Sequence, residues 1–297
     1  MLLDFLISVR SLNYLSFIII INLHRVLQRM GSAASRELDI IVDDGALEDS
    51  QSFSDTLRLN LQRLLIYAKS SDPILQRDVA ERLANEAVSP ERQAQIVECG
   101  GIKLLVQLTR STDTEVQRLS AHALANLSAL PINQKAMAEA EGSLDMLVEL
   151  LKSPCAEVQR QAAKTIANMS VIASNMHLIA DKKGLPSLIA LVSVPQIKTR
   201  IEAIAAIANL AIDDANERAL VEEGAIVTIL DCLRPIQPTD VDFLSQIARA
   251  LRNLTHSPDN SAVLKAAGGV PLLDILAKHP EERVRAQAMA ALANVKK

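Results

Sequence analysis

Aromatic residues and cysteines are scarce in this chain of 297 residues. Tryptophan is absent, and Phe, Trp and Tyr together make up 2% of the sequence. Leu, Ile, Val and Ala must therefore fill the core, which favours closely packed helices and argues against an aromatic-rich β-sandwich. The three cysteines, Cys99, Cys155 and Cys232, form no C-x-x-C pair. They indicate ordinary thiols in a reducing compartment, with no disulfide framework and no zinc site.

Neither sign of charge dominates. The sequence has 31 Lys and Arg against 35 Asp and Glu, a formal net charge of −4, so we expect no bulk attraction to nucleic acid phosphates. Tyr14, Tyr67 and four Phe offer few rings for stacking on bases. The sequence therefore predicts no nucleic-acid partner.

Sequence patterns of catalysis are missing as well. There is no H-E-x-x-H, no G-x-S-x-G, no G-x-x-x-x-G-K-[ST] and no G-x-G-x-x-G that opens a βαβ unit. The histidines are too scattered to suggest a metal site or a triad, and we expect surface or satisfied core roles for them. The prediction is a protein that is not an enzyme and that holds no cofactor and no metal.

The first 30 residues differ in kind from the rest. Residues 5–23 are almost wholly apolar, but Arg10 interrupts the stretch and makes it a borderline membrane span. Three interpretations stay open: a membrane anchor that leaves the following domain cytosolic, an extension that is not translated, and a targeting peptide. If translation starts at Met30, residues 30–35 fit the N-myristoylation pattern.

Residues 31–55 are predicted to form an acidic flexible linker. Between residues 37 and 55 there are seven acidic residues and no Lys or Arg, which is typical of a solvated tether. A role as an acidic docking peptide is the alternative. The expected location of the protein is cytoplasmic, with membrane association through the N-terminus left open.

From residue 56 onward the sequence repeats itself. An Asn that ends an apolar helical run recurs at intervals of 41, 42, 41, 44 and 41 residues, within the range of helical solenoids. We call these residues the asparagine ladder: Asn85, Asn126, Asn168, Asn209, Asn253 and Asn294.

Two further marks keep the same register. Glycines suited to a left-handed turn between helices occur at Gly101, Gly142, Gly184, Gly224 and Gly269. A second set of asparagines marks the start of a short first helix at Asn133, Asn175, Asn216 and Asn260. Each unit is thus predicted to contain a short helix, a glycine turn, a second helix, and a third helix that ends at the ladder Asn.

This pattern resembles the armadillo repeat over residues 56–297. The resemblance implies an all-α fold, a right-handed α-solenoid of about six armadillo repeats. A HEAT array, which has two helices per unit and usually lacks the glycine turn, is the alternative fold.

The resemblance also implies a binding surface. In armadillo proteins the third helix lines a concave groove, and similarity to importin-α and β-catenin implies that Asn126, Asn168, Asn209 and Asn253 bind the backbone of a partner segment. An Asn amide carries both a donor and an acceptor, so it suits an extended backbone. The alternative is that each Asn closes its helix by bonding to neighbouring turns.

The position four residues before each ladder Asn shares the groove side of the helix. Importin-α arrays carry Trp there to hold lysine stems, whereas this chain has His122, Lys164 and Arg249 in three of its units. Lysine-rich cargo is therefore not expected, and Lys164 and Arg249 favour an acidic or phosphorylated ligand. Arg77, Arg118 and Arg160, eight residues before the Asn, form either a solvated rim or a rail for an acidic ligand.

The predicted function is a non-catalytic scaffold or adaptor that binds an extended acidic segment of a partner protein in the groove. The alternative is the recognition array of a system such as a U-box ubiquitin ligase or a kinesin, whose catalytic or motor part lies elsewhere.

Overall fold

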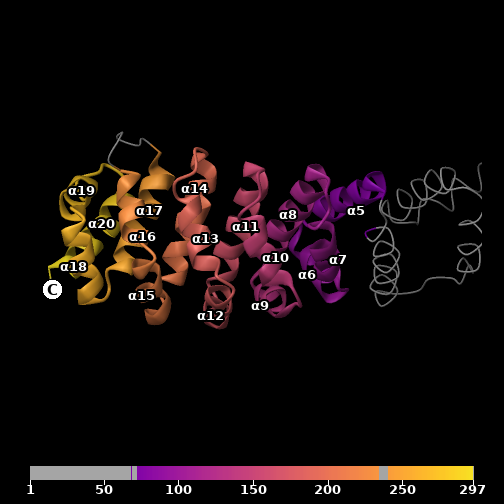
Figure 1. Ribbon diagram of the computed structural model, residues 1–297, viewed down its shortest axis with the longest axis horizontal. Coiled ribbons are helices and arrows are strands. Elements are labelled where there is room, and N and C mark those ends of the chain that lie inside the picture. Colours follow the sequence, from indigo (N-terminus) through magenta and orange to yellow (C-terminus); the bar gives the residue numbers. More distant parts are fainter. Residues whose placement is uncertain (1–67, 69–71, 234–239, 297) are drawn as a thin grey trace, which may run out of the picture. The chain divides into compact units, whose positions relative to one another are not determined.

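The computed structural model describes residue 68, residues 72–233 and residues 240–296. All of them belong to one compact unit that spans residues 53–297. Within these ranges the regular structure is entirely helical and consists of 16 helices. The predicted all-α class is confirmed (Figure 1).

The helices follow one another in groups of three. The first helices of the groups are α6 (Pro90–Glu98), α9 (Pro131–Glu139), α12 (Ala173–Asp181), α15 (Asp214–Glu222) and α18 (Pro258–Ala266). The second helices are α7 (Gly101–Leu108), α10 (Ser143–Leu150), α13 (Gly184–Leu191), α16 (Ala225–Asp231) and α19 (Gly269–Leu276). The third helices are α8 (Thr114–Ser128), α11 (Ala156–Met169), α14 (Ile197–Leu210), α17 (Val241–Leu254) and α20 (Glu282–Val295). A further third helix, α5 (Pro73–Glu86), precedes them, so three helices per unit favour the armadillo repeat over the HEAT repeat.

Helices in equivalent positions of successive units pack against one another. Each third helix contacts the next in the order α5, α8, α11, α14, α17, α20, and first helices contact one another from α6 through α15. Figure 1 shows the same succession as a continuous change of colour along the array. An apolar face that one unit cannot bury alone is therefore covered by its neighbour.

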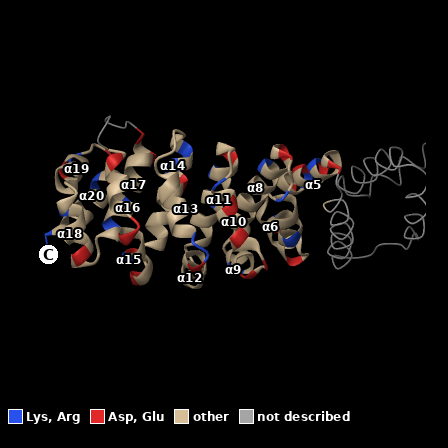
Figure 2. Cartoon of the chain, viewed as in Figure 1, with Lys and Arg blue, Asp and Glu red and all other residues tan. Residues whose placement is uncertain are grey.

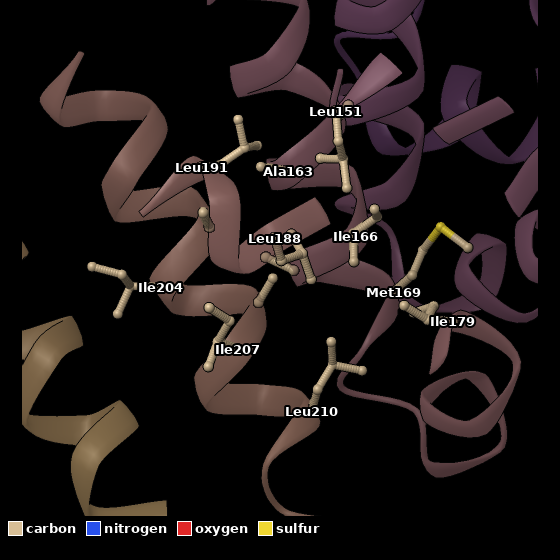
Figure 3. Packing of buried hydrophobic residues seen from close by; sticks show 14 of the residues in the cluster. Leu151, Ala163, Ile166, Met169, Ile179, Leu188, Leu191, Ile204, Ile207 and Leu210 are labelled. Atoms are coloured by element: carbon tan, nitrogen blue, oxygen red, sulfur yellow. The ribbon is translucent and has the colours of Figure 1, made fainter. Parts of the chain in front are cut away.

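Aliphatic side chains fill the space between units, as the lack of aromatics predicts. Ile166 of α11, Leu188 of α13 and Ile207 of α14 are fully buried and meet between two adjacent units (Figure 3). Each such side chain contributes about 1.5–3 kcal/mol of stability by leaving water. The core is thus one continuous layer shared by consecutive units.

A left-handed residue precedes the second helix in every complete unit. The residues with positive φ are Gly100, Gly142, Lys183, Gly224 and Gly268. The predicted left-handed turn is confirmed at Gly142 and Gly224, but it is wrong for Gly101, Gly184 and Gly269. Those three are the first residues of their second helices and have ordinary helical backbone.

Glycine at the first position of the second helix has a different cause, which is close packing on the first helix. A Cβ on Gly101 would lie 2.7 Å from the carbonyl oxygen of Ile96, and one on Gly184 would lie 2.8 Å from that of Ile179. No side chain fits at such distances. In pairs such as Gly100-Gly101, one glycine therefore permits the turn and the next permits the contact.

Several predictions fall outside the part of the chain that the structure describes. They concern the apolar residues 5–23, the start at Met30 and the acidic linker 31–55. Among the described helices, none combines the length and the apolar character needed to cross a bilayer. The three cysteines form no disulfide bond and are partly buried.

Candidate functional site

The asparagine ladder lies at the ends of the third helices. Each ladder Asn stands one or two residues before the last residue of its helix. Because these helices stack in order, the six amides form one row across the array. We call the surface that α5, α8, α11, α14, α17 and α20 form together the third-helix surface.

Four ladder amides bond to the preceding unit. Asn209 Nδ2 donates to the Ala167 carbonyl at 2.8 Å, Asn253 Nδ2 to that of Ala208 at 2.6 Å, and Asn294 Nδ2 to that of Arg252 at 3.0 Å. In each case the acceptor is the residue just before the ladder Asn of the preceding unit. Asn168 Nδ2 donates instead to the Ser128 hydroxyl at 3.0 Å. Part of the ladder therefore joins adjacent helices, as the alternative interpretation expected.

These internal bonds leave some donors and acceptors of the ladder amides unused. An Asn side chain has two N–H donors and two acceptor lone pairs, and one internal bond leaves the rest available. Asn126 makes no side-chain hydrogen bond within the described ranges and is partly exposed, as is Asn168. Asn209 is only 8% exposed. The amides at Asn126 and Asn168 are thus more accessible than that of Asn209.

At Asn253 the other side of the amide is also engaged. Its Oδ1 accepts a hydrogen bond from Arg252 Nε at 3.0 Å. This bond fixes both the amide and the base of the guanidinium, so Asn253 and Arg252 act as one polar group on α17.

Lys164 and His122 offer an acidic ligand less positive charge than the sequence predicted. Burial raises the pKa of Glu202 on α14, and the charges of Lys164 and Arg160 oppose that rise, which places both cations near this carboxyl. Burial, together with the charge of Arg118, lowers the pKa of His122. His122 is therefore neutral at neutral pH, and Lys164 has an acidic neighbour.

The three arginines eight residues before the Asn are all ion-paired. Arg77 Nη2 lies 2.7 Å from Asp113 Oδ2, Arg118 Nη2 2.6 Å from Glu115 Oε1, and Arg160 Nη2 2.5 Å from Glu157 Oε1. Their charge is compensated within the protein. They match the solvated rim better than a rail for an acidic ligand.

Arg249 and Arg252 on α17 differ from these cations. Neither forms an ion pair within 4.0 Å in the described part of the chain. Arg249 Nη2 donates to the Ala205 carbonyl at 3.3 Å, whereas its Nε is buried without a hydrogen-bond partner. Burial first, and then the charge of Arg252, lower the pKa of Arg249. Two like charges therefore stand together without a carboxylate.

Arg252 is not among the binding residues predicted from the sequence. The signal was present, because the residue before the ladder Asn is Ala in the other five units, at Ala84, Ala125, Ala167, Ala208 and Ala293. Arg252 also borders a surface hollow of about 480 Å³. The other residues around that hollow are Ala211, Ile212, Asp214, Glu217, Asn253, His256, Ala290 and Asn294.

The asparagines of the first helices have a structural role. Asn133 Nδ2 donates to the Gln93 carbonyl at 3.1 Å, Asn175 Nδ2 to that of Gln134 at 3.1 Å, and Asn216 Nδ2 to that of Met176 at 3.3 Å. All three side chains are buried. They join successive first helices, and their depth leaves the third-helix surface as the candidate site.

A metal site receives no support from the geometry. Within the described ranges, no group of three or more His, Cys, Asp or Glu side chains could hold a metal ion. The polar groups that the third-helix surface does offer are amides and guanidiniums, which suit hydrogen bonding to a partner.

Comparison with known proteins establishes the family. A family model described as armadillo-like matches residues 58–233, more than half of the chain. The chain belongs to the armadillo-like family.

Solved structures support the same fold. An engineered protein with 33% sequence identity superimposes with a TM-score of 0.73 over 80% of this chain and 96% of its own length. A designed armadillo repeat protein has 25% identity and a TM-score of 0.72 over 78% of this chain and 98% of its own. Another designed armadillo repeat protein, in complex with the peptide (KR)4, has 25% identity and a TM-score of 0.71 with the same coverage.

One curated relative is a kinesin-like protein, KIN-UA, of Oryza sativa subsp. japonica. It is 33% identical over 61 residues, which are 20% of this chain. The match spans 6% of the length of the kinesin-like protein, so the similarity concerns a short part of that protein.

Proposed function

We propose that this protein is a non-catalytic scaffold that binds an extended segment of a partner protein along the third-helix surface. The observation that carries the proposal is the row of ladder amides, above all Asn126 and Asn168, whose groups are partly exposed and not all bonded within the protein. The designed armadillo neighbour in complex with the peptide (KR)4 supports binding of this kind.

The ladder spacing suits an extended backbone. Packed helices lie about 8–10 Å apart, and an extended peptide advances about 3.3 Å per residue. Neighbouring ladder amides therefore meet the peptide at every second or third residue. At Asn168, Asn209 and Asn253 the bond from Nδ2 to the preceding unit orients the amide in advance, which reduces the entropy lost on binding.

The proposed ligand is acidic, unlike the basic peptide of the designed neighbour. Arg249 lacks a carboxylate partner in the described part of the chain, and no Trp is present to hold lysine stems. Lys164 and His122 take secondary roles, because Lys164 has Glu202 nearby and burial keeps His122 neutral. We place the protein in the cytosol, where its thiols stay reduced, with residues 5–23 or an N-myristoyl group as alternative membrane attachments.

Proximity labelling with the full chain tests the scaffold. The wild type is compared with a double variant, Asn126→Ala and Asn168→Ala, and with Lys135→Ala, an exposed substitution on α9 that leaves the third-helix surface intact. We expect a set of neighbours that the double variant loses and the control keeps. Identical neighbour sets for all three proteins, each shown to be folded by circular dichroism, would rule the proposal out.

The match to the kinesin-like protein favours a second candidate. On that hypothesis the array directs a motor or another catalytic part encoded in a longer chain. Sequencing the transcript on both sides of this reading frame distinguishes the candidates: a continuous motor reading frame supports the targeting array, and in-frame stop codons on both sides contradict it.

A further inference from the structure

The two arginines of α17 are adjacent on the helix surface. Arg249 and Arg252 are three residues apart, a spacing that makes side chains neighbours on a helix. The charge of Arg252 also acts on Arg249. Together they place two positive charges near each other on the third-helix surface.

In the described part of the chain, neither guanidinium has a carboxylate within 4.0 Å, unlike several other arginines of that surface. Arg77, Arg118 and Arg160 each contact a carboxylate, and Lys164 lies near Glu202. Lys, Arg, Asp and Glu are interspersed along the array in Figure 2, so no band of one sign would attract an anion from a distance. An anionic ligand must therefore be held by a local group of cations.

Arg249 is also partly withdrawn from water. Its Nε is buried without a hydrogen-bond partner, although its Nη2 reaches the Ala205 carbonyl. Burying part of a cation without a counter-charge costs free energy. An anion that reaches this guanidinium recovers that free energy, because hydrogen bonds between charged groups are the strong ones.

The hollow beside Arg252 supplies room and further polar groups. It measures about 480 Å³ and is bordered by Asn253, His256 and Asn294. Two acidic residues border it as well. Glu217 is 2% exposed, and its Oε1 accepts hydrogen bonds from the Ser257 N–H at 2.9 Å and Asn260 Nδ2 at 3.0 Å. The Oε1 atom of that carboxylate is thus hydrogen-bonded within the protein. Asp214 lies in the first turn of α15, a helix that contacts α17.

We propose that Arg249 and Arg252 bind the phosphoryl group of a phosphorylated serine or threonine in the extended segment. Two guanidiniums match the −1.5 to −2 charge of a phosphoryl group, whereas a carboxylate neutralises only one of them. The inference rests on the proposed function and adds the chemistry of one position of the ligand.

The chain itself provides the variants for a test. Arg252→Ala introduces the Ala that the other five units carry just before the ladder Asn. Arg249→Ala introduces the Ala that two other units carry at the equivalent position, four residues before the ladder Asn, as Ala205 and Ala290. Both variants should therefore fold. Lys135→Ala serves as the control, because it removes an exposed cation on α9, outside the third-helix surface.

The probes are three degenerate peptide libraries, each twelve residues long, with phosphoserine, serine or glutamate fixed at the centre. Binding to the full chain is measured by fluorescence polarisation. We expect wild type and Lys135→Ala to prefer the phosphoserine library about tenfold or more. Both α17 variants should lose this preference while they keep their affinity for the serine library.

Other results overturn the inference. Equal binding of the glutamate and phosphoserine libraries, or a preference that survives both α17 variants, contradicts a phosphoryl site at these arginines. If all libraries bind equally and Asn126→Ala weakens them all, the scaffold stands and only the phosphoryl site fails. If no library binds, both proposals fail.

Discussion

Single asparagines show how one residue type serves two purposes in this protein. Asn175 is fully buried and donates to the carbonyls of Gln134 and Met169, and its Oδ1 is buried as well, where no partner protein reaches it. Asn126 is partly exposed and forms no internal side-chain bond in the described part of the chain. Burial, rather than residue type, therefore separates a structural amide from a candidate binding amide.

Asn209→Ala and Asn126→Ala form a matched pair for stability. Asn209→Ala removes a buried bond of 2.8 Å to the Ala167 carbonyl and should lower the free energy of unfolding by about 1 kcal/mol. Asn126→Ala removes no internal bond and should change stability by less than about 0.5 kcal/mol. Urea unfolding followed by circular dichroism measures both. Equal losses would show that the ladder is structural throughout.

His122 predicts a pH dependence. Its pKa in the folded protein is lowered, mainly by burial, so the unfolded chain binds a proton more readily. The stability that this residue contributes is therefore present above its unfolded pKa of about 6.5 and is lost as the pH falls through the folded value. His122→Gln should lose less stability than the wild type between about pH 7.5 and pH 5.5. The carboxyls of Asp113, Glu115 and Glu157 have lowered pKa values. Their protonation therefore changes the stability at more acidic pH than this range.

At the scale of helices, the turn before each second helix was only partly predictable. The sequence predicted glycine turns at the right places, but it assigned the left-handed conformation to Gly101, Gly184 and Gly269. Adjacent glycines look alike in a sequence. Only the distance to the Ile96 carbonyl shows that Gly101 is needed for close packing on the first helix. In α13 the turn is made by Lys183, with φ of 60°, which no glycine pattern could indicate.

Lys183→Gly should stabilise the protein. A left-handed backbone costs an L-residue about 1 kcal/mol, and glycine avoids that cost. We expect a higher urea midpoint, equivalent to a gain of about 0.5–1 kcal/mol. Lys182→Gly is the control, because Lys182 has an ordinary φ of −84° and its replacement should give no gain. A lower midpoint for Lys183→Gly would show that this side chain has a stabilising contact outweighing the strain.

At the scale of the whole repeat unit, stability depends on neighbours. Third helices contact the next third helix in order, and the core is shared between consecutive units. Damage to one unit should therefore spread to adjacent units and fade with distance.

Leu188→Ala tests this nearest-neighbour behaviour. Leu188 is fully buried between α11 and α14 (Figure 3), and its truncation should cost about 2–5 kcal/mol. Hydrogen exchange measured by mass spectrometry should show the largest loss of protection in α11, α13 and α14 and the smallest in α5 and α20. A uniform loss from α5 to α20 would instead indicate one fully cooperative unit.

The sequence by itself determined the period, the three-helix unit and the position of the ladder asparagines. These features depend on local patterns, namely helical periodicity and turn residues, that recur within about 40 residues. The tertiary structure alone decided which polar groups are free. Asn209 bonds to a carbonyl 42 residues earlier, and Arg118 is neutralised while Arg249 is not. Such partners are set by the stacking of neighbouring units, and a repeating sequence does not state which side chains meet across that stack.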